Sequence, residues 1–382
     1  MSKTENISLY VTICFGLVLF SDFYYKFAKI YQLPNYSINF FVKSIIGLFM
    51  MYCLVTKNAI TKKEIVLAVL FFICASINLM MFPSVNFFEG TYLFLKHVFS
   101  VIVVFYFLKM HKQNNATLLF SAVEGFAYFN LLLILTGYIF SIDLFATYDM
   151  YRFGYNGVFK STSTASYFYM CFLAYYYVKH INKKDNIPLL ITILASSIMV
   201  GSKTLFISSA LFIFLYTFDK RQLMSKRPIK KQDLFLVSIA LSIIGFVSTF
   251  LYINNNTLLS SVYNDDGLIS AFFSYRNTVF SDAVIQIKEQ FSAIQYLFGN
   301  LASQIRRPEL ALADLFINLG VIGTITFLSL LFVNIPKKLP KRVIFLCSYI
   351  LLITLLRGNF FYYPTVLFFS AIFINAIIRS ND

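Results

Sequence analysis

Apolar runs long enough to cross a membrane recur along almost the whole of this 382-residue chain. A helix of about 20 apolar residues spans the roughly 30 Å hydrocarbon core of a bilayer. With 59% hydrophobic and only 13% charged residues, a soluble protein of this length could not cover its apolar surface. The sequence therefore predicts an all-α polytopic integral membrane helical bundle, a single domain over residues 1–382.

About twelve transmembrane spans are expected, with each boundary placed to within about four residues. The first has no small-residue cleavage site after it and is interpreted as an uncleaved span. The spans are 6–25, 36–56, 64–82, 91–108, 116–140, 163–178, 187–202, 205–218, 233–253, 309–333, 343–356 and 359–378.

The distribution of Lys and Arg sets the expected orientation. Lys and Arg are concentrated in the segments on the same membrane face as the N-terminus, above all in the basic loop 219–232. They are sparser in the longer loops on the other face. Because positive charge is retained in the cytoplasm, both termini and this loop are expected there. The net charge of +15 is explained by topology, and we expect no nucleic acid as a partner.

Two segments on the outer side, 141–162 and 254–308, are too long to be turns. Long ordered loops in compact proteins are usually functional. In the larger loop, apolar residues at helical spacing predict one amphipathic helix, which either lies in the membrane interface over a cavity or ties the loop down. These residues are Val284, Ile287, Phe291, Ile294 and Phe298.

The smaller outer loop and the next short connection carry candidate phosphate ligands. Arg152 and Lys160 could contact phosphate, and the alternative is an ordinary interfacial loop with two snorkelling cations. Lys203 follows Gly201 and Ser202 in a GSKT tetrapeptide that lacks the upstream glycine of a P-loop. A nucleotide is therefore not expected, and Lys203 is interpreted as a phosphate contact or as a topological anchor.

The larger outer loop carries further cations beside groups that could bind sugars. Arg276 is flanked by Tyr275 and Asn277, whose side chains could contact sugar hydroxyls. Arg306 and Arg307 stand immediately before the next span. Guanidinium groups donate a planar fork of hydrogen bonds to phosphate oxygens, so these arginines are candidate ligands of a diphosphate.

Two carboxylates, Glu309 and Asp314, open that span. If Arg307 and Asp314 both lie on the helix, they share a face about 10 Å apart along its axis, and Asn318 continues the face. An ionisable group within the membrane is costly, so Asp314 is expected to face a cavity or a partner. The alternative is an Arg–Asp pair that only ties the loop to the helix.

Other polar groups fit structural roles. Lys43, Lys96, His97 and Glu124 lie within spans and are expected in buried pairs that stabilise the bundle. The two outer loops contain neither His nor Cys, so neither a metal site nor a Ser–His nucleophile is expected there, and no cofactor is predicted.

Four of these stretches, in this order, resemble the bacterial O-antigen polymerase and O-antigen ligase superfamily. The resemblance covers roughly residues 150–333. Lys203 stands where the family often has Arg, and the large loop lacks the histidine typical of the ligases. The stretches are Arg152-Phe153-Gly154, Gly201-Ser202-Lys203, Arg276, and Glu309 with Asp314 before Gly320-Val321-Ile322-Gly323.

This resemblance implies a GT-C-like, metal-independent, inverting glycosyltransferase of the bacterial inner membrane. It would join undecaprenyl-diphosphate-linked repeat units into O-antigen or a similar surface polysaccharide, and a chain-length regulator would be a candidate partner. Arg276, Arg306 and Arg307 would stabilise the leaving diphosphate, with Arg152 holding a second one. Asp314, or else Glu309, would accept the acceptor proton. A ligase or a lipid-linked oligosaccharide flippase is the alternative.

Overall fold

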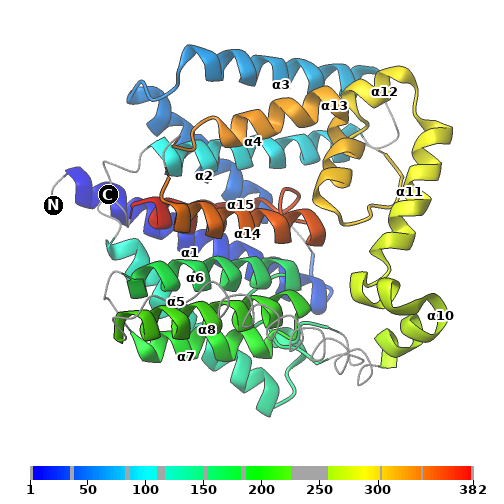
Figure 1. Ribbon diagram of the computed structural model, residues 1–382. Coiled ribbons are helices and arrows are strands. Elements are labelled where there is room, and N and C mark those ends of the chain that lie inside the picture. The colour runs from blue at the N-terminus through cyan, green and yellow to red at the C-terminus, as the bar shows by residue number, and fades with distance from the viewer. Residues whose placement is uncertain are drawn as a thin grey trace. The chain divides into compact units, whose positions relative to one another are not determined.

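The computed structural model describes residues 3–34, 38–81, 87–109, 117–148, 153–181, 186–224, 257–301, 303–336 and 339–379. Within these ranges the chain is helical and forms no β-strand (Figure 1). The helices are α1 (Lys3–Ile30), α2 (Ile38–Thr56), α3 (Lys62–Met81), α4 (Phe87–Lys109), α5 (Thr117–Ile139), η2 (Asp143–Phe145), α6 (Thr162–Ile181), α7 (Ile187–Met199), α8 (Lys203–Met224), α10 (Thr257–Phe273), α11 (Arg276–Gln290), α12 (Ala293–Phe298), α13 (Ala311–Phe332), α14 (Lys341–Arg357) and α15 (Pro364–Arg379).

The chain is a helical membrane protein. Six of its described helices are long and apolar enough to cross a bilayer, and they expose large apolar side chains such as Leu48 on α2 and Leu132 on α5. The six are Ser8–Ile30, Ile38–Thr56, Lys62–Met80, Phe88–Lys109, Leu118–Ile139 and Ala311–Phe332. Shorter apolar helices are Ile187–Met199, Lys203–Thr217, Val343–Leu355 and Pro364–Ile378.

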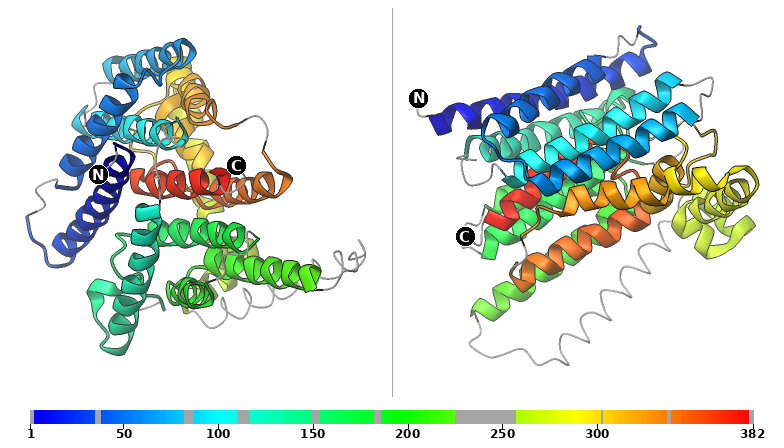
Figure 2. Two further views of the ribbon diagram at one scale, coloured as in Figure 1. Left: turned by 90° about the vertical axis from the view of Figure 1, so that its left-hand side faces the viewer. Right: turned by 90° about the horizontal axis from the view of Figure 1, so that it is seen from above.

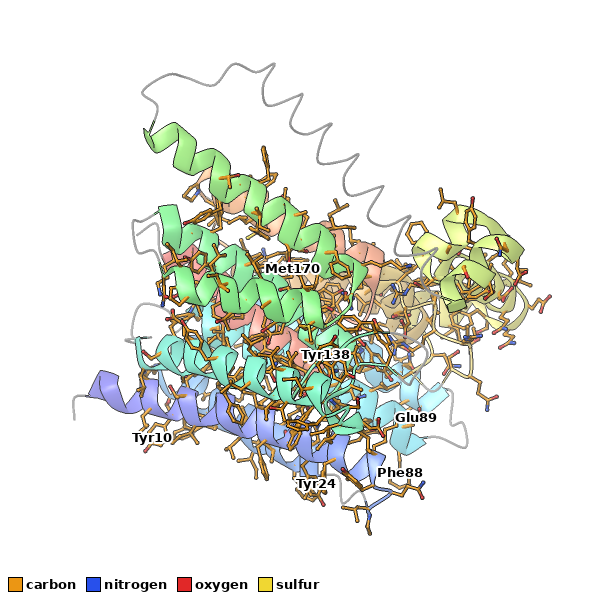
Figure 3. The ribbon with its side chains drawn as sticks, turned by 90° about the horizontal axis from the view of Figure 1, so that it is seen from below. Tyr10, Tyr24, Phe88, Glu89, Tyr138 and Met170 are labelled. Carbon is orange, nitrogen blue, oxygen red and sulfur yellow. The ribbon has the colours of Figure 1, made fainter. Side chains whose placement is uncertain are left out.

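Two of the expected spans need separate comment. The span at 163–178 is α6, which packs against α7 and α8 and buries nearly every side chain, including Met170 (Figure 3). By contrast, Tyr10 on α1 is 51% exposed. The span at 233–253 lies outside the described residues. Helix α8 extends to Met224, so the part of the predicted basic loop 219–232 that follows Met224 also lies outside them.

The chain divides into two compact units. The first comprises residues 1–7, 37–115 and 275–375, and the second comprises 8–36, 116–274 and 376–382. In the first unit α13 packs against α3, α4 and α14, while α12 lies against both α3 and α13 (Figure 2). In the second unit α5 packs on α7, and α6, α7 and α8 contact one another.

Helix α13 is broken at Gly320, where the backbone adopts φ 63° and ψ −170°. This conformation is almost exclusive to glycine. Gly320 lies directly against Gly299, which ends α12, and a Cβ atom on either glycine would overlap the backbone of the other segment. Asn78 of α3 fastens this crossing, because its amide donates to the carbonyl oxygens of Phe298 (2.7 Å) and Asn318 (3.0 Å).

The predicted outer loop 254–308 is helical over much of its length, with α10, α11 and α12 inside it. The prediction of one amphipathic helix across Val284–Phe298 is wrong, because this stretch is divided between α11 and α12. Phe291 is extended (φ −82°, ψ 123°), and Ser292 opens α12 with a capping box to Gln295. Phe291 instead packs into a small core with Ile317 of α13, which ties the segment down.

Candidate functional site

Arg307 and Asp314 pair at the beginning of α13. Arg307 Nη2 donates to Asp314 Oδ2 at 2.7 Å and to Asn359 Oδ1 at 3.1 Å. Arg307 and Asp314 do not share a helix face, because α13 begins at Ala311, after Arg307. Glu309 has a left-handed backbone (φ 54°), so the chain turns there and brings Arg307 back to the first helical turn, where Asp314 is buried.

Aromatic rings and a second cation surround this pair. The Arg307 guanidinium carbon lies 3.3 Å from the centre of the Tyr362 ring. Lys96 Nζ of α4 lies 4.6 Å from the same ring and 4.2 Å from that of Tyr92. Such cation–π contacts strengthen when the cation is removed from water. They hold two positive charges against the Tyr362 ring, and one of them, Arg307, is paired with Asp314.

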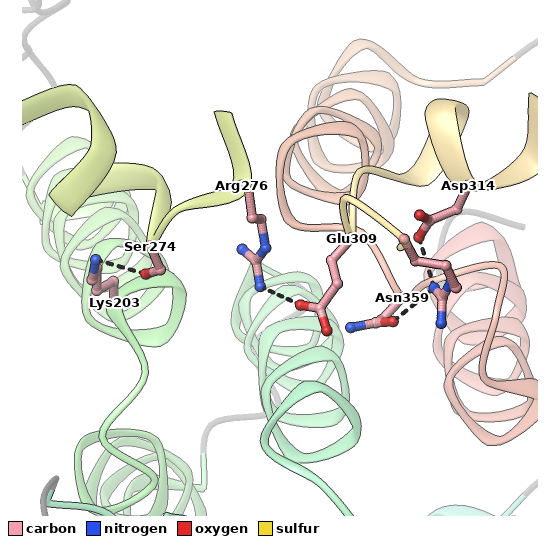
Figure 4. A network of polar contacts seen from close by, with 7 residues as sticks. Lys203, Ser274, Arg276, Glu309, Asp314 and Asn359 are labelled. Carbon is pink, nitrogen blue, oxygen red and sulfur yellow. Dashed lines mark hydrogen bonds and ion pairs between the residues drawn. The ribbon is translucent and has the colours of Figure 1, made fainter. Parts of the chain in front are cut away.

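A second guanidinium–carboxylate pair forms nearby in the same unit. Arg276, the first residue of α11, donates from Nη2 to Glu309 Oε2 at 3.0 Å, and the two side chains point toward one another in Figure 4. These side chains are 25% and 47% exposed. The backbone of Glu309 lies directly against Gly358, leaving no space there for a Cβ, so the turn that carries Asn359 is packed against this pair.

The other predicted sugar and phosphate ligands of this loop are accessible to different degrees. Arg306 is exposed and has no hydrogen bond or ion pair to any described residue. Tyr275 is 36% exposed and adopts a left-handed backbone (φ 65°) just before α11, whereas Asn277 is half-buried. Arg306 is therefore the most exposed of the three arginines of this loop.

An apolar groove of about 560 Å³ adjoins the Arg276–Glu309 pair. It runs between α11, α12 and the first turns of α13, and Leu355 of α14 also lines it. Phe280 lies one helical turn after Arg276, and Leu310 follows Glu309 in the chain, which places the ion pair at the rim of the groove. Hydrocarbon would fit this lining, whose only charged side chain among the described residues is that of Lys288.

The predicted ligands of the second unit have structural partners. Lys203 Nζ donates to the carbonyl oxygen of Ala271 (2.6 Å) and to Ser274 Oγ (3.1 Å), so it caps the C-terminal end of α10. Lys160 lies 3.7 Å over the Tyr25 ring. Arg152 lies outside the described residues. These contacts favour anchoring roles for both lysines.

The smaller outer loop is a compact structure in its described part, 153–161. Lys26 of α1 donates to Asn156 Oδ1 at 2.6 Å and to the Gly157 carbonyl at 3.0 Å. Asn130 of α5 accepts from the Val158 amide at 2.8 Å, and Gly157 lies against its side chain. Gly157 has a left-handed backbone (φ 61°), which glycine adopts without steric strain, so the chain can turn tightly there.

Sequence reasoning did not assign Lys96, His97, Asn359 or Tyr362 to this site, and the structure gathers all four around Arg307 and Asp314. Lys96 and His97 were expected in pairs that stabilise the bundle. Their position as ionisable residues within a span was the available signal, since such groups usually mark functional sites. No three His, Cys, Asp or Glu side chains gather as a metal site within the described ranges.

Comparison with protein-family models, with curated proteins and with solved structures finds no match to this chain.

Proposed function

We propose that the protein polymerises undecaprenyl-diphosphate-linked oligosaccharide repeat units into a surface polysaccharide at the outer face of a bacterial inner membrane. One observation carries the proposal: two arginine–carboxylate pairs, Arg276–Glu309 and Arg307–Asp314, lie at the beginning of a membrane helix. Such a site could bind a diphosphate and accept a proton within one small volume.

In this reaction a hydroxyl of the acceptor sugar attacks the anomeric carbon of the donor, and the lipid diphosphate leaves. Negative charge grows on the departing oxygens, so guanidinium groups already in place lower the barrier. A guanidinium has five N–H donors, and the contacts with Glu309, Asp314 and Asn359 engage only Nη2 of each arginine. Both arginines thus keep further donors for phosphate, and exposed Arg306 adds a third charge.

The proton of the attacking hydroxyl goes to a carboxylate. Asp314 is the first choice, because its Oδ1 has no hydrogen-bond partner among the described protein groups while Oδ2 is fixed by Arg307. Glu309 is the second choice. Direct displacement by the hydroxyl inverts the anomeric configuration.

The groove beside Arg276 supports a lipid-linked substrate. Its apolar lining would take part of a polyprenyl chain, with the diphosphate at the rim where Arg276 and Glu309 lie. We further propose about twelve spans, a GT-C-like bundle and cytoplasmic termini, which place the arginines outside. Tyr275, Asn277 and Arg152 remain candidate contacts for sugars and a second diphosphate.

Purified full-length protein in vesicles, supplied with purified lipid-linked repeat units, tests the proposal. Polymerisation predicts a ladder of glycans that stay attached to undecaprenyl diphosphate and grow by whole repeat units. Transfer of glycan only to an added lipid A core would indicate a ligase. Movement of intact lipid across the bilayer without new glycosidic bonds would indicate a flippase. Either of the last two results would overturn the proposed polymerase.

A further inference from the structure

The two arginine–carboxylate pairs of the site differ in how firmly each is held. Arg307 Nη2 donates both to Asp314 and to Asn359. The Tyr362 ring covers one face of the same guanidinium, and the Asp314 side chain is only 5% exposed. Breaking a buried pair of this kind is costly, so we expect Arg307 and Asp314 to stay together when a substrate binds.

The Arg276–Glu309 pair is held by one hydrogen bond. Arg276 Nη2 donates to Glu309 Oε2 at 3.0 Å, and neither side chain makes another hydrogen bond or ion pair (Figure 4). Ion pairs as exposed as this one contribute little to folding, so the pair can open without unfolding the protein. The backbone of Glu309 is packed against Gly358, so opening requires only that the Glu309 side chain rotate toward solvent.

A phosphate that binds Arg276 in a bidentate manner must compete with Glu309. The other donors of Arg276 allow a first, single contact with an oxyanion. A bidentate contact uses two neighbouring N–H groups, and each fork of a guanidinium includes Nη2, together with either Nη1 or Nε. Nη2 is the nitrogen that Glu309 holds. Because two anions on one nitrogen repel each other, the carboxylate and the phosphate would occupy this position in turn.

We propose that Glu309 is an internal competitor for Arg276. The lipid-linked diphosphate displaces the carboxylate when it binds, and the carboxylate returns to Arg276 when the diphosphate product leaves. This role rests on the proposed glycosyl transfer. It is separate from acceptance of the proton, for which Asp314 is the first choice.

Product release is the step that such a competitor assists. When the bond between the anomeric carbon and the diphosphate oxygen breaks, its electron pair stays on the phosphate. The product diphosphate therefore carries more negative charge than the donor and is attracted more strongly by a guanidinium. A carboxylate that regains Arg276 offsets part of this attraction. Because the pair must open before diphosphate binds, it lowers the apparent affinity by about twofold to sixfold.

Binding of inorganic pyrophosphate to the full-length protein in nanodiscs, measured by calorimetry at fixed ionic strength, tests the competition. Glu309→Gln should bind pyrophosphate about twofold to sixfold more tightly than wild type, since a neutral amide competes far less for the guanidinium. Asp282→Asn is the matched control, because it removes an exposed carboxylate about 9 Å along α11 from Arg276. This control should leave the affinity unchanged.

The gain in affinity must also depend on Arg276. In an Arg276→Gln background, the Glu309→Gln change should give no comparable gain. Unchanged or weaker binding by Glu309→Gln would overturn the competition, because a pair that only ties α11 to the segment before α13 gives that result. An equal gain in Asp282→Asn or in the Arg276→Gln background would also overturn it, as would the absence of pyrophosphate binding in both wild type and Glu309→Gln.

Release of the lipid product tests the role in turnover and needs no activity. Radiolabelled undecaprenyl diphosphate, chased from the detergent-solubilised full-length protein, should dissociate about twofold to sixfold more slowly from Glu309→Gln than from wild type. Equal or faster release would refute the release role. A gain in pyrophosphate affinity in Glu309→Gln, in a protein whose wild type forms no glycan, would keep the competition and remove the proposed glycosyl transfer.

Discussion

Gly299 and Gly320 lie backbone to backbone, and neither position has space for a Cβ atom. This contact joins the end of α12 to the break in α13, and Asn78 of α3 hydrogen bonds across it. The loop that carries Arg306 and Arg307 begins just after Gly299 and returns at α13. The crossing therefore fixes both ends of the segment on which the proposed site depends.

Gly320→Ala should destabilise the protein strongly. The glycine-only backbone conformation alone costs another residue about 1–3 kcal/mol, and the Cβ overlap with Leu297 and Gly299 adds to this. Thermal unfolding in one detergent gives the measurement. Gly16→Ala in α1 is the control, because nothing lies near its Cβ position and alanine should stabilise a helix there by about 0.5–1 kcal/mol. Equal thermal unfolding midpoints for Gly320→Ala and Gly16→Ala would contradict the close backbone contact between Gly299 and Gly320.

Lys203→Met should loosen the end of α10. The variant removes the donor to the Ala271 carbonyl and Ser274 Oγ, each worth about 1.5–3 kcal/mol for a charged donor. Hydrogen exchange of residues 268–274 should accelerate, while the same peptide in the Lys29→Met variant, which loses an exposed cation, should not change. If exchange is unaffected and substrate KM rises instead, Lys203 binds phosphate, one of the two roles expected from the sequence.

Arg276→Lys should separate activity from stability. The Arg276–Glu309 pair is partly exposed, and pairs of this kind contribute about 0–1 kcal/mol to folding. The unfolding midpoint should therefore remain near wild type. Polymerisation should fall at least about tenfold, since an ammonium cannot replace the planar fork of donors on a diphosphate. Full-length polymer at a wild-type rate would remove this bidentate role.

Arg306 should face the outside of the cell. In a variant without the natural cysteines (Cys14, Cys53, Cys74, Cys171 and Cys347), Arg306→Cys should react with a membrane-impermeant maleimide in intact spheroplasts. Lys57→Cys, in a loop assigned to the cytoplasm, should react only after permeabilisation. The reverse pattern would place the arginines on the cytoplasmic face and remove the proposed enzyme.

Several features of the fold were accessible from sequence. Long apolar runs predicted a helical membrane protein, and this prediction is confirmed. The apolar runs did not predict the break in α13. This break depends on the backbone contact between Gly320 and Gly299, which belongs to another segment of the chain. The sequence does contain a signal for the end of α11 and the beginning of α12, because Ser292 and Gln295 have the spacing of a capping box. The helical spacing of apolar residues across this point nevertheless favoured one continuous helix.

The site was predictable only in part. Arg307 and Asp314 were named from their proximity in sequence, and they do pair, although through a turn at Glu309 and not along a helix. His97, Asn359 and Tyr362 come from α4 and from the turn after α14. Nothing in local spacing links them to α13, since tertiary packing alone brings them together.

The most direct test compares polymerisation rates for Arg307→Lys, Asp314→Asn and Glu64→Gln in vesicles supplied with lipid-linked repeat units. Glu64 is also a buried, paired carboxylate of the same unit, and it lies about 21 Å along α3 from Asn78 at the crossing. Loss of either carboxylate should destabilise the bundle to a similar extent.

Per folded molecule, we expect Arg307→Lys and Asp314→Asn to lose about 10²-fold or more of the rate, while Glu64→Gln retains the wild-type rate. Wild-type rates per folded molecule in both Arg307→Lys and Asp314→Asn would show that their ion pair only supports the structure, and would contradict the proposed site.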